Sequence, residues 1–214
     1  ITGITTRKNI FPLILALSAL PWLSVKYVPV TAALAAYFLY KNWNSERKKT
    51  YFFSVVMGIS AIAYLIIHKR IYGGWTVYAS GDHFVNGEFE VVGRNPNLAA
   101  RTRRLSGLLL DQQFGLIPWT PAFFALIPAF AFTVKERFKE TFLLLLCAVV
   151  GWSVATWVAL TMHGWWWPGR QLVVILPTAI ITMAILAEKF RAWRWFIYLG
   201  GISGVIAWLW LALE

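Results

Sequence analysis

The stretch His163-Gly164-Trp165-Trp166-Trp167-Pro168-Gly169-Arg170 separates two apolar runs, 142–162 and 171–187, each long enough to cross a lipid bilayer as a helix. Its glycines and its proline stop a helix from continuing, so the chain turns here. Three adjacent tryptophans favour a membrane–water interface, where an indole ring is half buried and half wet. The stretch therefore predicts a helical membrane protein, with the permanent cation Arg170 at the edge of its apolar region.

The composition agrees with a membrane protein. Of 214 residues, 59% are hydrophobic and only 14% are charged, which leaves too little polar surface for a soluble globule. The net charge of +11 comes from lysines and arginines that cluster between the apolar runs, and this arrangement orients membrane helices. We therefore expect membrane lipids around the chain and no nucleic-acid partner.

The apolar runs predict an all-α, polytopic fold of about seven membrane helices. Five runs are good single spans: 51–67, 114–134, 142–162, 171–187 and 195–213. The region 10–40 is too long for one span, and Pro21 and Pro29 bracket a polar point at Ser24–Lys26. We expect a hairpin of two short helices there, each of about 14 residues and roughly 21 Å long.

Two further patterns describe how these helices pack. Small residues recur at the spacing of close helix contacts in Gly200-xxx-Gly204, Gly151-xxx-Ala155 and Ser54-xxx-Gly58. Prolines within the predicted spans imply kinks, and they are Pro118, Pro121, Pro128 and Pro177.

Basic loops set the predicted orientation. The loops 41–50, 135–141 and 188–194 are all basic and fall on one side, the inner one, if 10–40 is a hairpin. The segment 68–113 then forms an outer-face loop, in which 98–110 is expected to be an interfacial helix. We expect residues 1–214 to be one helical membrane domain and, because the chain begins at Ile1, a fragment of a longer polypeptide.

Three charged residues are the first candidates for a binding site. Arg170, framed by aromatic residues such as Trp166, can grip a phosphate or a carboxylate with two parallel hydrogen bonds. Lys26 lies between two short apolar helices, either at a hairpin tip in the interface or as a phosphate contact. Asp111, at the start of a span, either caps that helix or orients a ligand hydroxyl or Arg170.

The outer side carries further candidates. His163 is an interfacial hydrogen-bonder or a general acid or base, and Arg70 belongs to a group of outer cations. That group comprises His68, Lys69, Arg70, Arg94, Arg101, Arg103 and Arg104. Two interpretations stay open: these side chains reach toward lipid headgroups, or they form a basic funnel for an anionic lipid such as a lipid-linked phosphate.

No metal or cofactor is expected. The acidic group around Asp82, His83 and Glu88 has no ligand spacing of a closed metal site. The sequence also holds no Gly-rich phosphate loop, no Cys/His metal pattern and no nucleophile elbow. A divalent metal therefore has no support, and soluble nucleotide has no visible role.

Two segments carry a family resemblance. Residues 108–121 (LLLDQQFGLIPWTP) and 165–177 (WWWPGRQLVVILP) resemble the C-terminal half of polytopic GT-C-type membrane glycosyltransferases, which are mannosyltransferase-like. Members carry a Leu-Leu-x-Asp-x-x-x-Gly-Leu run and, two helices later, a Trp-Trp-Gly-Gly run followed by an arginine. Residues 19–27 are similar to their Leu-Pro-Trp-Leu-His-x-Arg/Lys segment, and 72–75 to an aromatic-Gly turn. The resemblance covers most of 10–187 and departs at the Trp-Trp-Trp-Pro-Gly turn.

The resemblance implies a function. Members move a sugar from a polyprenyl-phosphate carrier to an acceptor on the outer face, in many cases in bacterial and archaeal plasma membranes. It implies that Arg170, Lys26 and Asp111 line the donor cavity, and that the catalytic base is an acidic residue upstream of this chain. The alternatives are a lipid or solute transporter, which proline-broken helices also suit, and a non-catalytic membrane subunit.

Overall fold

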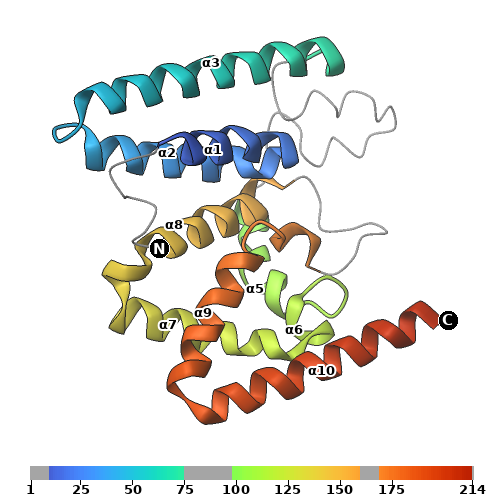
Figure 1. The fold of residues 1–214 in the computed structure, drawn as a ribbon. Coiled ribbons are helices and arrows are strands. Elements are labelled where there is room, and N and C mark those ends of the chain that lie inside the picture. Colours follow the sequence, from blue (N-terminus) through green and yellow to red (C-terminus); the bar gives the residue numbers. More distant parts are fainter. Residues whose placement is uncertain (1–9, 75–97, 160–168, 214) are drawn as a thin grey trace. The chain divides into compact units, whose positions relative to one another are not determined.

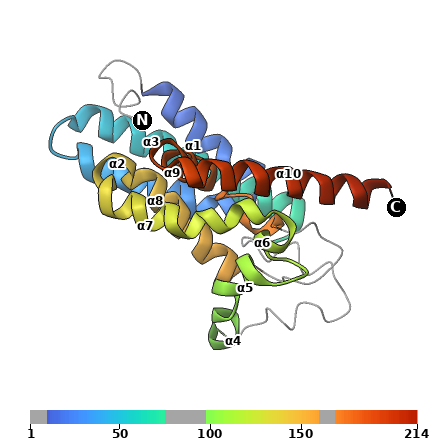
Figure 2. The ribbon, with the colours of Figure 1, turned by 90° about the horizontal axis from the view of Figure 1, so that it is seen from below.

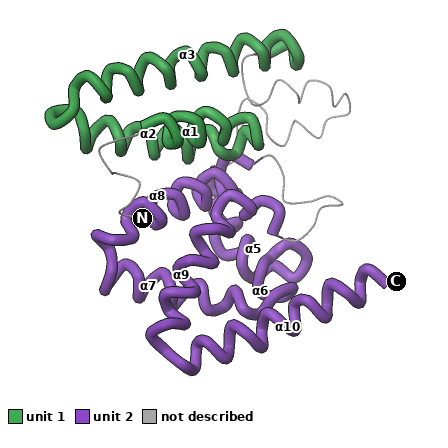
Figure 3. Tube along the Cα trace, in the orientation of Figure 1, with its two compact units in different colours: residues 1–96 green, residues 97–214 purple. Residues whose placement is uncertain are grey.

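The described part of the chain is helical throughout. The computed structural model describes residues 10–74, 98–159 and 169–213 (Figure 1), and these ranges contain helices and turns but no strand. They belong to two compact units, Ile1–Pro96 and Asn97–Glu214 (Figure 3). The prediction of an all-α fold is confirmed for these residues.

Unit 1 holds the predicted N-terminal hairpin and a long third helix. Its elements are α1 (Phe11–Leu23), the 3-10 turn η2 (Val25–Tyr27), α2 (Val28–Asn42) and α3 (Arg47–Tyr72). The helix breaks at Ser24, whose backbone is extended and whose hydroxyl accepts the amide hydrogen of Lys26 over 3.4 Å. Pro29 lies in the first turn of α2, where its missing N–H has no cost. The division therefore falls where the sequence predicted it.

The core of unit 1 forms where α1 packs against α2 and α3 (Figure 1). Ile14, Leu17 and Phe53 are buried there, and the rings of Phe38 and Phe53 lie 4.4 Å apart. The rest of α3 has a largely exposed apolar surface: only 11% of its most apolar 18-residue window is buried. Such a surface suits lipid better than water.

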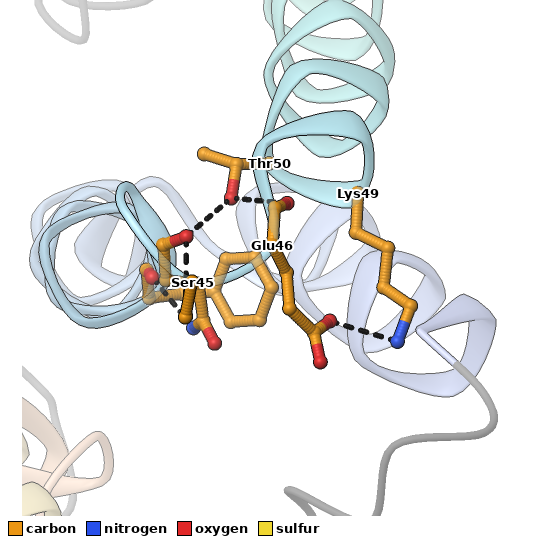
Figure 4. A network of polar contacts seen from close by, with 6 residues as sticks. Ser45, Glu46, Lys49 and Thr50 are labelled. Atoms are coloured by element: carbon orange, nitrogen blue, oxygen red, sulfur yellow. Dashed lines mark hydrogen bonds and ion pairs between the residues drawn. The ribbon is translucent and has the colours of Figure 1, made fainter.

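The turn from α2 to α3 is held by a small polar network (Figure 4). The buried Thr50 hydroxyl lies 3.1 Å from the carbonyl oxygens of both Asn42 and Glu46. The Lys49 ammonium pairs with the Glu46 carboxylate at 2.7 Å. This pair is half exposed, so the backbone contacts of Thr50 fix the turn more than the ion pair does.

Unit 2 consists of short helices followed by longer ones. The first elements are α4 (Leu98–Thr102), α5 (Arg104–Leu110), α6 (Leu116–Trp119) and the 3-10 helix η4 (Pro121–Ala125). The others are α7 (Leu126–Glu136), α8 (Phe138–Ser153), the π-helix η5 (Val154–Val158), the 3-10 turn η6 (Arg170–Leu172), α9 (Leu176–Lys189) and α10 (Arg191–Leu213). Helix α9 packs against α7, α8 and α10, and α10 lies along η4 (Figures 1 and 2).

Small residues let the helices of unit 2 approach closely. A Cβ atom at Gly200 would lie 2.5 Å from the backbone nitrogen of Ala122, and one at Gly151 would lie 2.4 Å from Ile175 Cγ2. Gly204 meets Thr120 in the same way. The first two small-residue pairs are thus packing positions, as predicted, whereas nothing lies within 4 Å of a Cβ at Gly58.

Three described helices are long and apolar enough to cross a membrane. They are Arg47–Tyr72, Phe138–Val158 and Arg191–Leu213, with mean hydropathies of 2.0, 2.0 and 1.9. Each overlaps one predicted span, which is consistent with a membrane protein. The prediction of seven membrane helices is not confirmed, because the remaining apolar runs form shorter pieces.

Two predicted spans are interrupted near prolines. The run 114–134 is divided into α6, η4 and α7, and η4 starts at Pro121. The run 171–187 begins with η6, and α9 starts only at Leu176, with Pro177 in its first turn. Proline has no N–H and clashes with the preceding turn, so it is best tolerated in the first turn of a helix. Pro121 and Pro177 therefore lie at helix starts, whereas the sequence predicted that they would kink continuous helices.

The expected outer segment 68–113 is partly helical. Residues 68–72, including Arg70, continue α3 to its end at Tyr72, where Gly73 adopts a left-handed conformation. Residues 98–110 are helical, as α4 and α5 with a break at Arg103, and their interfacial position stays a prediction. Residues 75–97 lie outside the described part.

Candidate functional site

Unit 2 contains a cavity of about 360 Å³ beside Arg170. Its aromatic walls are Trp119, Phe123 and Trp208, and its aliphatic walls are Leu116, Val173 and Leu176. The rings of Trp119 and Trp208 lie 5.6 Å apart and come from α6 and α10. Among the described residues that line it, Arg170 is the charged one and Thr120 carries a hydroxyl. A cavity of this kind suits an apolar molecule that carries one anionic group.

Arg170 owes its place to the backbone of Gly169. Gly169 has φ +77°, a left-handed conformation that costs other residues free energy. It is buried, and a Cβ atom there would lie 2.4 Å from Leu116 Cδ2. The sharp turn at Gly169 opens η6, and the exposed side chain of Arg170 follows at the cavity.

Asp111 lies in the turn between α5 and α6. Its Oδ1 atom accepts hydrogen bonds from the backbone amides of Gln113 and Phe114, over 2.9 and 3.0 Å. Asp111 is the residue that ends α5, and α6 starts at Leu116 after the extended Gly115. The carboxylate therefore caps the turn before the next helix, and the described residues that line the cavity do not include it.

The structure brings these two turns together. The amide of Gly169 donates a hydrogen bond to the carbonyl oxygen of Phe114 over 3.2 Å. In the same unit, one buried cluster contains Leu108, Leu116 and Leu172. The turn that contains Asp111 is thus in backbone contact with Gly169, the residue before Arg170.

Two arginines of the group that the sequence predicted to lie on the outer side bind a helix end. The π-helix η5 ends α8, and the Nη1 atoms of Arg101 and Arg104 donate to the carbonyl oxygens of Trp157 and Ala159. Arg101 is only 5% exposed. Burial, with a smaller contribution from neighbouring Arg101, lowers the pKa of Arg104, but an arginine stays charged at neutral pH. Both cations satisfy open carbonyls at the negative end of a helix dipole, a role that the funnel prediction did not foresee.

Lys26 and Arg70 belong to unit 1. Lys26 lies in η2 and is half buried, and Arg70 is exposed in the last turn of α3, where a cation favours the helix dipole. Neither is among the residues that line the cavity of unit 2. Their assignment to the same site as Arg170 stays a prediction.

The remaining candidates fall on other parts of the chain. Trp166 and His163 lie outside the described residues, as do Asp82, His83 and Glu88. Within the described ranges, no group of three or more His, Cys, Asp or Glu side chains is arranged to hold a metal ion.

The comparisons with known proteins give no relative. No protein-family model, no curated protein and no solved structure matches the chain. The site therefore rests on its own geometry and on the motifs of the sequence.

Sequence reasoning missed much of the cavity wall. Trp119 follows Pro118 in the Asp111 motif, so an aromatic residue between two helix-breaking prolines was an available signal. Trp208 is one of several tryptophans in the apolar run 195–213, and hydropathy does not distinguish the one that faces the cavity.

Proposed function

We propose that this protein is a membrane glycosyltransferase that moves a sugar from a polyprenyl-phosphate carrier to an acceptor on the outer face of the membrane. In this proposal the cavity beside Arg170 holds the phosphate end of the carrier. The protein would reside in a prokaryotic plasma membrane as a multi-pass protein.

One observation carries the proposal: a largely apolar, aromatic cavity has an arginine, Arg170, among the residues that line it. An isoprenoid chain is apolar and its phosphate is anionic, so the carrier offers both features that the cavity can bind. Arginine forms two parallel hydrogen bonds to a phosphate, which fixes its orientation as well as its position. A volume of about 360 Å³ lies within the usual range for ligand pockets of about 300–1,000 Å³.

The chemistry of sugar transfer suits this arrangement. When the bond from the sugar to the phosphate breaks, negative charge grows on the departing phosphate. A cation already in place stabilises that charge without having to rearrange during the reaction. Arg170 would have this role, while an acidic residue would deprotonate the acceptor, as in the enzymes that the sequence resembles.

The sequence motifs add support from another direction. The Asp111 run and the Arg170 turn resemble glycosyltransferase segments that are separated by two helices, and in the fold they come into backbone contact. The three long apolar helices suit an enzyme whose substrate is a lipid.

A transfer assay tests the proposal. Membranes that contain the protein receive radiolabelled polyprenyl-phosphate sugars, mannose first, and new glycosides are counted. Arg170→Gln should lower transfer by about a hundredfold, as for other lost charge-stabilising donors. Arg191→Gln is the matched control, since Arg191 is exposed at the start of α10 and does not line the cavity.

Each outcome decides between the alternatives. Transfer at the wild-type rate by Arg170→Gln would exclude the proposed role of that residue. Labelled sugar that crosses the vesicle membrane unchanged, with no new glycoside, would favour a transporter. Binding of the carrier without transfer or movement would favour a non-catalytic subunit.

A further inference from the structure

We propose that Asp111 is a positioning residue, whose carboxylate holds one turn that fixes both the cation and an aromatic wall of the cavity. The inference deepens the proposed function and rests on it in one respect, namely that the cavity binds a lipid phosphate. It assigns to Asp111 a role that needs an acceptor oxygen but no negative charge.

Asp111 holds the turn between α5 and α6 through its side chain and its backbone. Asp111 Oδ1 accepts the amide hydrogens of Gln113 and Phe114, and the Asp111 carbonyl oxygen accepts that of Gly115 over 2.8 Å. The turn is tight, because a Cβ atom at Gly115 would lie 2.6 Å from the Asp111 carbonyl oxygen. One side chain and one carbonyl of the same residue thus hold three successive amides.

Two carbonyl oxygens of this turn bind residues at the cavity. Its Gln112 carbonyl oxygen accepts a hydrogen bond from the indole Nε1 of Trp119 over 3.1 Å. Its Phe114 carbonyl oxygen accepts the Gly169 amide hydrogen over 3.2 Å. Trp119 is an aromatic wall of the cavity, and Gly169 directly precedes the cavity cation Arg170.

The positions of Trp119 and Gly169 therefore depend on the shape of this turn. Amides and carbonyls of one turn keep a fixed relation only while the turn keeps its shape. Without an acceptor at position 111, the amides of Gln113 and Phe114 lose their partner and the turn relaxes. Trp119 and Gly169 then lose their common support, because each is hydrogen-bonded to a carbonyl oxygen of this turn.

Two lipid probes test the inference on the full chain in detergent. Farnesyl phosphate carries the apolar chain and the anion, and farnesol carries the chain alone. The measured quantity is the ratio of their affinities, obtained by calorimetric titration. For wild type we expect farnesyl phosphate to bind at least tenfold more tightly, as one charge-assisted contact provides.

The variants at position 111 separate a positioning role from the others. Asp111→Ala should lower the ratio of the affinity for farnesyl phosphate to that for farnesol about fivefold, the effect of a misaligned charge-assisted contact. Asp111→Asn keeps an acceptor oxygen and should stay within about twofold of wild type, because neutral acceptors also cap such turns. A residue that acts as a base or through its charge would lose as much with Asn as with Ala, and that result would overturn the inference. An unchanged ratio in Asp111→Ala would overturn it as well.

A second measurement keeps the two proposals distinguishable. If wild type binds both probes equally, the lipid-phosphate proposal fails, and hydrogen exchange of peptides that cover 111–119 and 169–172 still tests the turn. Asp111→Ala should speed exchange in both peptides and Asp111→Asn in neither, whereas faster exchange in 111–119 alone would contradict the inference. If Asp111→Ala does not fold, Asp111→Ser replaces it, since a hydroxyl can accept one of the two amide hydrogens.

Discussion

Gly169 donates its amide hydrogen to the carbonyl oxygen of Phe114 over 3.2 Å, and this one bond joins the turn of Arg170 to the turn of Asp111. The two residues belong to segments that the sequence marked separately, one by its tryptophans and one by its acidic motif. Their contact lies beside an apolar cavity with a single arginine among its lining residues.

Gly169→Ala should destabilise the protein more than Gly73→Ala. Both glycines have a left-handed backbone, with φ of +77° and +79°, which costs an alanine about 1–2 kcal/mol. Only at Gly169 does a Cβ atom also meet a neighbour, Leu116 Cδ2 at 2.4 Å, while nothing lies within 4 Å at Gly73. Thermal unfolding in detergent measures the difference, and equal losses would show that Leu116 moves aside without cost.

Gly200→Ala should loosen α10, whereas its neighbour Gly201→Ala should not. A methyl group at Gly200 would lie 2.5 Å from the backbone nitrogen of Ala122, but at Gly201 it meets nothing within 4 Å. Backbone cannot yield as a flexible side chain does, so we expect a loss of about 1–3 kcal/mol at Gly200. At Gly201 alanine should instead gain up to about 1 kcal/mol of helix propensity.

The readout for this pair is thermal unfolding, together with the fluorescence of the cavity tryptophans. Because Trp208 lies on α10 and lines the cavity, Gly200→Ala should also weaken binding of farnesyl phosphate. Equal unfolding temperatures for the two variants would contradict the close packing of α10 on η4.

Arg101→Gln and Arg104→Gln should each destabilise the end of α8, and Arg103→Gln should not. The first two side chains donate to the carbonyl oxygens of Trp157 and Ala159, and Arg103 between them is exposed. The loss at the buried Arg101 should be about 1–3 kcal/mol, the cost of an unsatisfied polar group. Chemical unfolding measures it, and three equal effects would favour a shared role in attracting anionic lipid.

The structure agrees with the sequence where local chemistry decides. Ser24 and Pro29 break a long apolar run into α1 and α2 because an extended serine and a proline both favour a new helix start. The long helices α3 and α10 follow directly from hydropathy. No tertiary contact was needed for these parts.

The parts that sequence reasoning missed depend on packing between distant segments. Hydropathy cannot show that Leu172 and Ile175 enter a buried cluster with Leu108. In the structure the predicted span 171–187 therefore begins with the short η6, and the regular helix α9 starts only at Leu176. The sequence singled out Arg170 as a candidate because glycine, proline and tryptophans mark its turn. The capping role of Asp111 was one open interpretation, but its target, the 113–114 amides, depends on a turn that the apolar pattern does not reveal.

Cysteine labelling tests the predicted orientation. In a Cys147→Ser background, which removes the single native cysteine, Ser45→Cys and Phe190→Cys should react with an impermeant maleimide only from the inner side. Ser106→Cys, on α5, should react only from the outer side. The basic loops near the first two positions set this expectation, and labelling of all three from one side would contradict it.

The most direct test of the central claim compares farnesyl phosphate with farnesol as ligands of wild type and Arg170→Gln. We expect wild type to prefer the phosphate by at least tenfold, and Arg170→Gln to lose this preference while it still binds farnesol. Arg191→Gln should behave as wild type. Retention of the full phosphate preference by Arg170→Gln would contradict the claim that this arginine and its cavity form a lipid-phosphate site.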